Sequence, residues 1–346
     1  MLNNILQEVA NKEKLLQQAE ELKKKKFSPG FDGMTAEKAY VWFEINSKKI
    51  IKEIADGNYE PMPVIGFNTA KKNGGYRSFV KMTAIDTIIQ NTLIGSIKEF
   101  CEEKFSDYSF AYRGNRGVSS ALEQYCNYAE IYKFAAKTDP ISCFDKIDRN
   151  ILKERLTQFF NNEKITDFIM RFVNIPVLVD GVFTYPEKGV FQGLAISNLL
   201  CNIYFDLLDK TLEKQEIPFI RYGDDVIVFA NSTTEITQYH NLVKNEVTKS
   251  MKLKINQHKS KIDSVANLSF LGHRFEKKHK TVTVLDTNNN SSNAYANWHE
   301  STPFNFRNTY DILSDGILRQ KDYSLIFDND FSVSDIPVKN TDVTIP

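Results

Sequence analysis

Two spacings of apolar residues alternate along the chain, and together they predict a fold of both helices and strands. Apolar residues three or four positions apart predict helices over 1–26, 35–55, 84–105, 150–160, 197–212 and 235–250. Short apolar runs bounded by turn residues predict strands over 61–67, 76–80, 134–138, 219–222, 226–229 and 270–275, and a hairpin over 177–183. We therefore expect an α+β fold, with Ser197 as the N-cap of a long, largely buried helix.

The last sixty residues differ in pattern from the rest of the chain. Asn and Ser crowd residues 286–293, which predicts a linker. Beyond it, residues 310–346 alternate short apolar runs with Asp, Gly and Asn, which predicts a small β-rich unit. No apolar run approaches membrane-spanning length, and the charged N-terminus lacks the apolar core of a signal peptide. We expect a cytoplasmic protein with no membrane partner.

The composition is that of an ordinary globular protein and does not by itself point to nucleic acid. The 346 residues are 42% hydrophobic, enough for two or more subdomains, and 44 basic residues balance 44 acidic ones. A polymerase needs a basic groove, but it does not need a basic total. The four cysteines form no close pair and share no ligand spacing with the five histidines, so neither a zinc site nor a disulfide framework is expected.

Acidic residues follow or interrupt strongly apolar segments at two places. The predicted strand over 134–138 ends at Asp139, and a predicted hairpin over 219–229 carries Asp224 and Asp225 at its tip. Aspartate normally avoids strands, so a pair of them flanked by strong strand formers needs a reason. Taken alone, the hairpin is explained equally well by ordinary Gly-Asp turn chemistry and by a functional carboxylate pair.

A carboxylate cluster at the ends of adjacent strands suits phosphoryl transfer to a growing nucleic-acid strand. That reaction uses two hard cations about 4 Å apart, which activate the attacking hydroxyl and neutralise the triphosphate. Magnesium prefers oxygen ligands, and carboxylates supply them.

Seven segments, in order along the chain, resemble motifs of bacterial reverse transcriptases of the group II intron type. They are residues 71–77 (KKNGGYR), 109–116 (SFAYRGNR), 139–147 (DPISCFDKI), 189–204 (GVFQGLAISNLLCNIY), 222–225 (YGDD), 256–260 (NQHKS) and 270–273 (FLGH). Residues 30–35 and 57–64 also fit the bacterial branch. A single motif of this kind is weak, but seven in the right order leave little room for chance.

The resemblance implies a role for each matching residue. Asp139, Asp224 and Asp225 would be catalytic and would ligate two Mg²⁺ ions, with Mn²⁺ as an alternative. The residues expected to bind the incoming nucleotide are Lys71, Arg77, Phe144, Gln192, Gly193 and Lys259. Among these, Phe144 would exclude a ribose 2′-hydroxyl, and Tyr222 would contact the primer. Asp145 and Asp209 match family positions that we interpret as structural.

The resemblance also implies a right-hand polymerase fold with fingers and palm. We expect a helical N-terminal extension over 1–60, fingers over 61–133, a palm with the catalytic site over 134–285, a linker over 286–309 and a β-rich tail over 310–346. The family usually has proline where this chain has Phe191, and serine-proline where it has Ser197-Asn198. A helical thumb is expected to be reduced or absent, because the linker follows the last motif so closely.

The tail resembles the β-rich start of the CRISPR spacer integrase, which some bacteria fuse behind a reverse transcriptase. The implied function is an RNA-directed DNA polymerase that copies an RNA template from a DNA or RNA primer with dNTPs, in antiviral defence by CRISPR spacer acquisition and with integrase proteins as partners. Two alternatives remain open: a stand-alone phage-defence reverse transcriptase and an RNA-binding, maturase-like protein.

Overall fold

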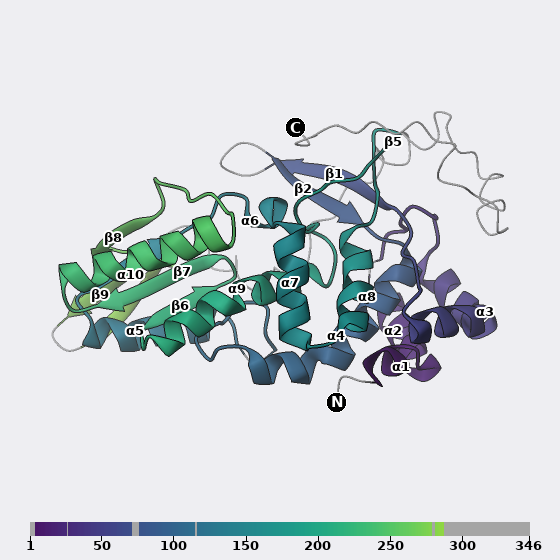
Figure 1. Cartoon of the computed structure of the whole chain (residues 1–346), viewed down its shortest axis with the longest axis horizontal. Coiled ribbons are helices and arrows are strands. Elements are labelled where there is room, and N and C mark those ends of the chain that lie inside the picture. The colour runs from purple at the N-terminus through teal and green to yellow at the C-terminus, as the bar shows by residue number, and fades with distance from the viewer. Residues whose placement is uncertain (1–3, 26, 71–75, 115, 279–280, 287–346) are drawn as a thin grey trace.

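The computed structural model describes residues 4–25, 27–70, 76–114, 116–278 and 281–286 (Figure 1). Its α-helices are α1 (Ile5–Val9), α2 (Lys12–Lys23), α3 (Ala36–Asp56), α4 (Ala84–Lys104), α5 (Val118–Ile131), α6 (Cys143–Lys146), α7 (Arg149–Phe160), α8 (Glu163–Val173), α9 (Ser197–Lys214) and α10 (Thr233–Asn245). Its strands are β1 (Val64–Ala70), β2 (Tyr76–Lys81), β3 (Phe134–Thr138), β4 (Val177–Val179), β5 (Val182–Thr184), β6 (Phe219–Tyr222), β7 (Asp225–Ala230), β8 (Lys261–Ser264), β9 (His273–Lys278) and β10 (Thr281–Asp286). The expected α+β fold is confirmed.

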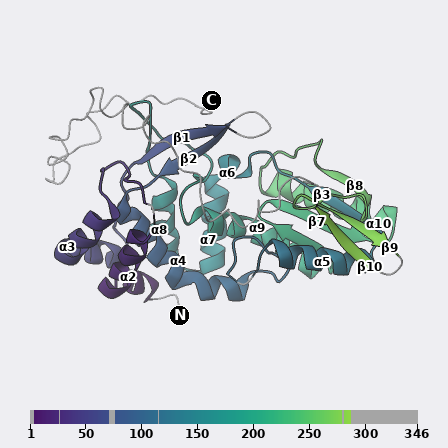
Figure 2. The ribbon, with the colours of Figure 1, turned by 180° about the vertical axis from the view of Figure 1, so that it is seen from behind.

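Two four-stranded sheets lie in different parts of the molecule. The antiparallel sheet has the strand order β6-β7-β3-β8, and the mixed sheet has the order β2-β1-β4-β5. Figure 1 shows the antiparallel sheet at one end of the molecule and the N-terminal helices at the other, with α4, α7, α8 and α9 between them. Figure 2, seen from behind, shows the β1–β2 hairpin standing above these middle helices.

Strand β7 is apolar on both faces because helices cover both sides of the antiparallel sheet. Val226 and Val228 belong to the main core, which also contains the buried Ile236 and Val243 of α10. Ile227 and Phe229 belong to a second core that includes α5, where the Tyr125 and Phe229 ring centroids lie 5.3 Å apart. This double burial explains why β7 forms a continuous apolar run and why its register is strongly specified.

Several predicted element boundaries are wrong. The single helix expected over 1–26 is two helices, because the Asn11 side chain accepts a hydrogen bond from the Lys14 backbone N–H and caps α2. Ser197 is not the N-cap of α9, since Ile196 occupies that position and the Ser197 hydroxyl donates to the Phe191 carbonyl at 2.5 Å. The helix expected over 235–250 changes to a π-helical turn at Glu246–Ser250.

The C-terminal expectations are only partly addressed by the described residues. The strand expected over 270–275 begins at His273, after a tight turn in which Phe270 and His273 form an isolated bridge. It pairs with β10 as an antiparallel hairpin. The linker over 286–309, apart from Asp286, and the β-rich tail over 310–346 lie outside the described residues. No helix in the described part of the chain is long and apolar enough to cross a bilayer.

Candidate active site

The antiparallel sheet brings the three predicted catalytic aspartates to one end of two neighbouring strands. Tyr222 pairs with Asp225 in the β6–β7 hairpin, so Gly223 and Asp224 form its two-residue tip. Gly223 has φ +66°, the left-handed conformation that such tight hairpin tips favour. Strand β3 pairs with β7 up to Thr138 and Val226, so Asp139 follows at the same end of the sheet as the tip.

The three carboxylates interact electrostatically. Burial raises the pKa of Asp224 to about 6, and the negative charges of Asp225 and Asp139 add to the rise. Burial also raises the pKa of Asp225 against the opposing effect of Lys137, and Asp139 again adds to it. Like charges held together in this way disfavour one another's ionised forms, and a bound cation would remove that cost.

Two lysines flank the carboxylates. The Lys137 ammonium lies 3.0 Å from Oδ2 of Asp225, while the Lys259 Nζ lies 3.9 Å from Oδ2 of Asp139. The loop that carries Lys259 also fixes Asp139: the Asn256 N–H donates to the Asp139 carbonyl at 2.9 Å. The Asp139 N–H in turn donates to the Ser260 hydroxyl at 3.0 Å. Lys259 therefore lies beside Asp139, the first of the three predicted aspartates.

The donor set fits a hard divalent cation. Oδ1 of Asp225 is buried and has no hydrogen-bond partner among the described residues, although a buried carboxylate oxygen normally has one. All the ligands on offer are carboxylate oxygens, which Mg²⁺ and Mn²⁺ prefer. No three acidic, histidine or cysteine side chains of the described residues already converge as metal ligands. Asp139, Asp224 and Asp225 would have to turn towards the ion to hold it.

A buried arginine holds the β6–β7 hairpin on helix α9. Arg221 is fully buried, and its guanidinium donates to both Asp209 carboxylate oxygens, with Nε 2.8 Å from Oδ1 and Nη2 2.6 Å from Oδ2. Its Nη1 donates to the Asn202 side chain at 2.8 Å and to the Gly223 carbonyl at 2.9 Å. Asp209 therefore has the structural role expected for it. Asp145, the other aspartate expected to be structural, lies on α6 with an exposed side chain.

The structure describes one of the two nucleotide-binding residues predicted on the β1–β2 hairpin. Arg77 is exposed on β2 opposite Thr69 of β1, so its guanidinium is available to a ligand. Lys71 lies in the hairpin loop over 71–75, outside the described residues.

Gln192 and Gly193 connect the predicted nucleotide pocket to the β1–β2 hairpin. The Val80 N–H of β2 donates to the Gln192 carbonyl at 2.8 Å, and Phe79 and Gln192 form a parallel bridge. Gly193 has φ +106°, and an added Cβ would lie 2.3 Å from the Val80 carbonyl oxygen. The close neighbour that requires glycine here is thus the backbone of β2.

Phe144 lies on the short helix α6, directly after the Asp139 segment. Its ring is half-buried against the main core. Its backbone carbonyl accepts a hydrogen bond from Val190 at 2.8 Å, which ties α6 to the segment that carries Gln192. Phe144 therefore lies where the 139–147 segment meets the segment that carries Gln192. Both segments contain residues predicted to bind the nucleotide.

Two residues of this site were not predicted from the sequence. One is Lys137, described above. The other is Tyr112, whose ring is 47% exposed and lies 3.5 Å from the position of an added Cβ on Gly223. Tyr112 has φ 62°, a strained conformation for a residue with a side chain, and such strain is found mainly at functional sites. A tyrosine in a sequence does not reveal that its φ is positive, so the sequence carried no signal for the position of Tyr112 in this site.

Comparisons with known proteins agree with this geometry. Residues 69–275, more than half of the chain, match the family model described as reverse transcriptase (RNA-dependent DNA polymerase). Protein YkfC of Escherichia coli is 22% identical over 291 residues, which cover 72% of this chain and 76% of YkfC. The group II intron-encoded protein LtrA of Lactococcus lactis is 29% identical over 198 residues, which cover 57% of this chain and only 32% of LtrA.

Solved telomerase structures share the fold at low sequence identity. Telomerase from Candida albicans superimposes with a TM-score of 0.51 at 13% identity, over 67% of this chain and 47% of that one. Telomerase from Candida tropicalis gives a TM-score of 0.50 at 17% identity, over 75% of this chain and 50% of that one. With the family match, the expected resemblance to intron-encoded reverse transcriptases is confirmed: this chain belongs to the reverse transcriptase (RNA-dependent DNA polymerase) family.

Proposed function

We propose that this chain is an active RNA-directed DNA polymerase in which Asp139, Asp224 and Asp225 hold two divalent metal ions. One observation supports this most strongly: the β3 and β7 strand ends bring Asp139 and Asp225 close enough to Asp224 for their charges to raise its pKa. A structural cluster of three like charges would be costly without a cation to neutralise it. An RNA template, a DNA or RNA primer and dNTPs are the proposed partners.

The proposed mechanism assigns a task to each group near the carboxylates. Two Mg²⁺ ions, with Mn²⁺ as an alternative, would supply the positive charge that activates the primer 3′-hydroxyl and neutralises the triphosphate. Asp224 must be ionised to serve as a ligand, and the Lys137 ammonium, 3.0 Å from Oδ2 of Asp225, favours the ionised form of Asp225 beside it. Lys259, whose Nζ lies 3.9 Å from Oδ2 of Asp139, would neutralise the departing pyrophosphate or donate a proton to it.

The remaining roles concern the nucleotide and the primer. Arg77, with Lys71 from the same hairpin, would bind the triphosphate through its planar guanidinium. Phe144 would exclude a 2′-hydroxyl, and Gln192 and Gly193 would line the pocket beside β2. Tyr222, next to the acidic tip, would contact the primer end.

Primer extension tests this proposal directly. Full-length protein with poly(rA), oligo(dT), dTTP and Mg²⁺ should give elongated product, and Asp224→Ala should abolish it. The matched control is Lys153→Ala, which should extend like the wild type. It removes an exposed lysine of α7 that forms an ion pair with Asp167 of α8. Equal extension by Asp224→Ala would show that the metal assignment is wrong.

We further propose that the polymerase serves CRISPR spacer acquisition in the cytoplasm, in the company of integrase proteins. The support is the resemblance of residues 310–346 to the start of the spacer integrase. A spacer-acquisition assay in cells would distinguish this from stand-alone phage defence and from a maturase-like role. RNA-derived spacers should appear with the wild type and disappear with Asp224→Ala, while spacers taken from DNA continue.

A further inference from the structure

An arginine at the first position of α7 contacts the segment that precedes Gln192. Arg149 follows Asp148, the N-cap of α7. Its Nε donates to the Gly189 carbonyl at 2.9 Å, and its guanidinium carbon lies 5.3 Å from the Phe191 ring centroid. One side chain therefore holds two residues of this segment, the first by a hydrogen bond and the second by the face of its charged group.

The position of Arg149 is costly for a cation. Burial lowers the pKa of its guanidinium to about 10, and its Nη2 is buried without a hydrogen-bond partner among the described residues. The positive end of the α7 dipole also disfavours a cation there. The carboxylate of the neighbouring Asp148 is engaged elsewhere, since it accepts from two α7 backbone N–H groups and pairs with Lys252. A charge buried with so little compensation is destabilising, so the contacts of Arg149 need a further reason.

Residues 189–192 connect the start of α7 to the β1–β2 hairpin. At one end of this segment, the Gly189 N–H donates to the Ile147 carbonyl at 2.7 Å. At the other end, the Gln192 carbonyl accepts from the Val80 N–H of β2 at 2.8 Å. The direction in which the chain leaves Gly189 therefore determines whether Gln192 reaches β2.

Two residues of the segment give its backbone little intrinsic restraint. Gly189 has φ +84°, and an added Cβ would lie 2.8 Å from the Asp145 carbonyl oxygen, so glycine is required although it restrains the chain least. Phe191 stands where the family usually has proline, and it lacks the ring that would fix φ. The contacts of Arg149 fall on these same two residues.

We propose that Arg149 is a positioning residue, which holds residues 189–191 so that Gln192 stays hydrogen-bonded to β2. Its Nε fixes the Gly189 carbonyl, and its guanidinium face fixes the Phe191 ring. A cation–π contact strengthens when it is desolvated, so the burial that is costly for the charge also tightens its hold on the ring. The inference rests on the proposed function and deepens it, because Gln192 would line the nucleotide pocket only while the segment stays in place.

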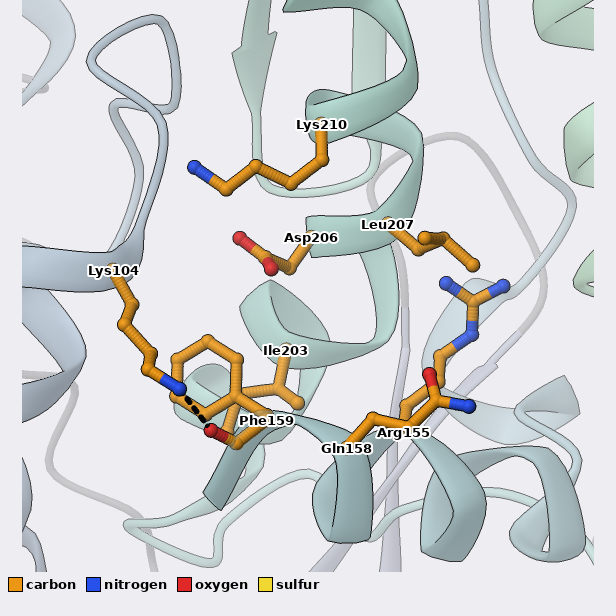
Figure 3. A pocket seen from close by; sticks show the side chains of 8 residues that line it. All are labelled: Lys104, Arg155, Gln158, Phe159, Ile203, Asp206, Leu207 and Lys210. Atoms are coloured by element: carbon orange, nitrogen blue, oxygen red, sulfur yellow. Dashed lines mark hydrogen bonds between the residues drawn. The ribbon is translucent and has the colours of Figure 1, made fainter. Parts of the chain in front are cut away.

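A second arginine of α7 provides a matched control. Arg155 also has a buried nitrogen, Nη1, without a partner among the described residues, and its guanidinium carbon lies 5.4 Å from the Tyr204 ring centroid. Figure 3 shows Arg155 beside Leu207 in a hollow that residues of α7, α9 and the end of α4 line. The two arginines thus share a helix, an unpartnered nitrogen and an aromatic neighbour, but no residue of 189–192 lines the hollow around Arg155.

Hydrogen–deuterium exchange of the full-length protein, resolved to single amides, tests this inference without catalysis. The Gln192 carbonyl protects the Val80 N–H, so Arg149→Ala should speed exchange of that amide about tenfold. Arg155→Ala should leave it within about twofold of the wild type. Phe191→Leu should act like Arg149→Ala, and the double variant should exchange no faster than either single variant, because both substitutions remove one contact. Unchanged Val80 exchange in Arg149→Ala, or equal acceleration by Arg155→Ala, would overturn the inference.

Steady-state primer extension then tests whether the contact matters to the nucleotide. In Arg149→Ala, KM for dTTP should rise about tenfold while kcat stays within about threefold, and Arg149→Lys, which keeps the charge, should restore part of the loss. Arg155→Ala should leave KM within about twofold of the wild type. Faster Val80 exchange with an unchanged KM would overturn the link to the nucleotide pocket. If the wild type extends no primer, the proposed function fails, and the exchange experiment still decides the role of Arg149.

Discussion

Asp224 is the carboxylate with the least local compensation in the acidic site. Asp225 has the Lys137 ammonium at 3.0 Å and Asp139 has the Lys259 Nζ at 3.9 Å, whereas no such pair involves Asp224 among the described residues. Its pKa of about 6 results from burial and from the charges of the other two aspartates. A bound cation should therefore interact most favourably with Asp224. Of the three aspartates, the loss of Asp224 should weaken metal binding most.

Phe144 should control the choice between deoxyribonucleotides and ribonucleotides. Replacing it with alanine opens space where the 2′-hydroxyl would lie, so Phe144→Ala is expected to reduce discrimination against UTP by at least about tenfold. The measurement is the ratio of kcat/KM for dTTP and UTP on poly(rA). Phe100→Ala, which changes a partly buried aromatic on α4, is a useful comparison. Unchanged discrimination in Phe144→Ala would remove its gating role.

Tyr112 should support the β6–β7 hairpin at the cost of backbone strain. Glycine adopts φ 62° without strain, so Tyr112→Gly is expected to leave the free energy of unfolding within about 1 kcal/mol of the wild type, because relieved strain offsets lost packing. Primer extension should nevertheless fall about ten- to hundredfold, since the ring no longer packs on Gly223. Urea unfolding and extension rates measure the two effects. An active glycine variant would show that Tyr112 is only a surface residue.

At the scale of elements, the sequence predicted element boundaries most accurately where an element packs against apolar side chains on both sides. Strand β3 was predicted with its observed ends. Strand β7 was predicted within one residue at each end, because its burial on both faces leaves a continuous apolar run. Helix α4, with ten buried residues along its length, was predicted to within one residue for the same reason. The three aspartates followed from these elements, because each stands where a well-predicted strand ends.

The errors arose where side-chain hydrogen bonds or tertiary contacts decide the local conformation. Ser197 looks like a helix cap, but its hydroxyl is bonded to the Phe191 carbonyl. Lys137 was missed because a lysine in a strand gives no sign of its partner until the β3–β7 register places it beside Asp225.

Gly193 should fix the contact between the β1–β2 hairpin and the segment before α9. An added Cβ would lie 2.3 Å from the Val80 carbonyl oxygen, and φ +106° is unfavourable for alanine. Gly193→Ala is expected to destabilise the fold by about 2–3 kcal/mol and to raise KM for dNTPs. Chemical denaturation and steady-state kinetics are the measurements.

Gly95→Ala provides the matched control for that substitution. Gly95 lies inside α4, and an added Cβ there meets no atom within 4 Å. This change should stabilise the protein by up to about 1 kcal/mol, because alanine favours helix. If Gly193→Ala and Gly95→Ala had the same effect on the free energy of unfolding, the close approach of residue 193 to β2 would not contribute to stability.

At the scale of the whole molecule, the raised pKa of Asp224 should make stability depend on pH and on metal. Its pKa is about 6 in the folded protein and about 3.9 in an unfolded chain, so the folded state binds the proton more tightly. The stability that this group contributes is fully present below about pH 4 and is lost as the pH rises through 6. The loss should be on the order of 1–3 kcal/mol in metal-free protein.

Thermal unfolding in EDTA between pH 4 and pH 8 measures this effect. Asp224→Asn should flatten the curve relative to the wild type, whereas Asp206→Asn, which removes another buried carboxyl with a pKa near 6, should leave the contribution of Asp224 in place. Mg²⁺ should raise the unfolding temperature of the wild type at pH 7.5 more than at pH 5, since protons compete with the metal. A metal effect that persists in Asp224→Asn would contradict this assignment.

The most direct test counts metal ions at the acidic site. Electron paramagnetic resonance of Mn²⁺, titrated into protein with a primer–template and a non-hydrolysable dNTP analogue, should report two tightly bound ions per wild-type chain. Asp139→Asn and Asp225→Asn should each lose at least one of them. Two tightly bound ions retained in both variants would contradict the claim that the ends of β3 and β7 form one metal site.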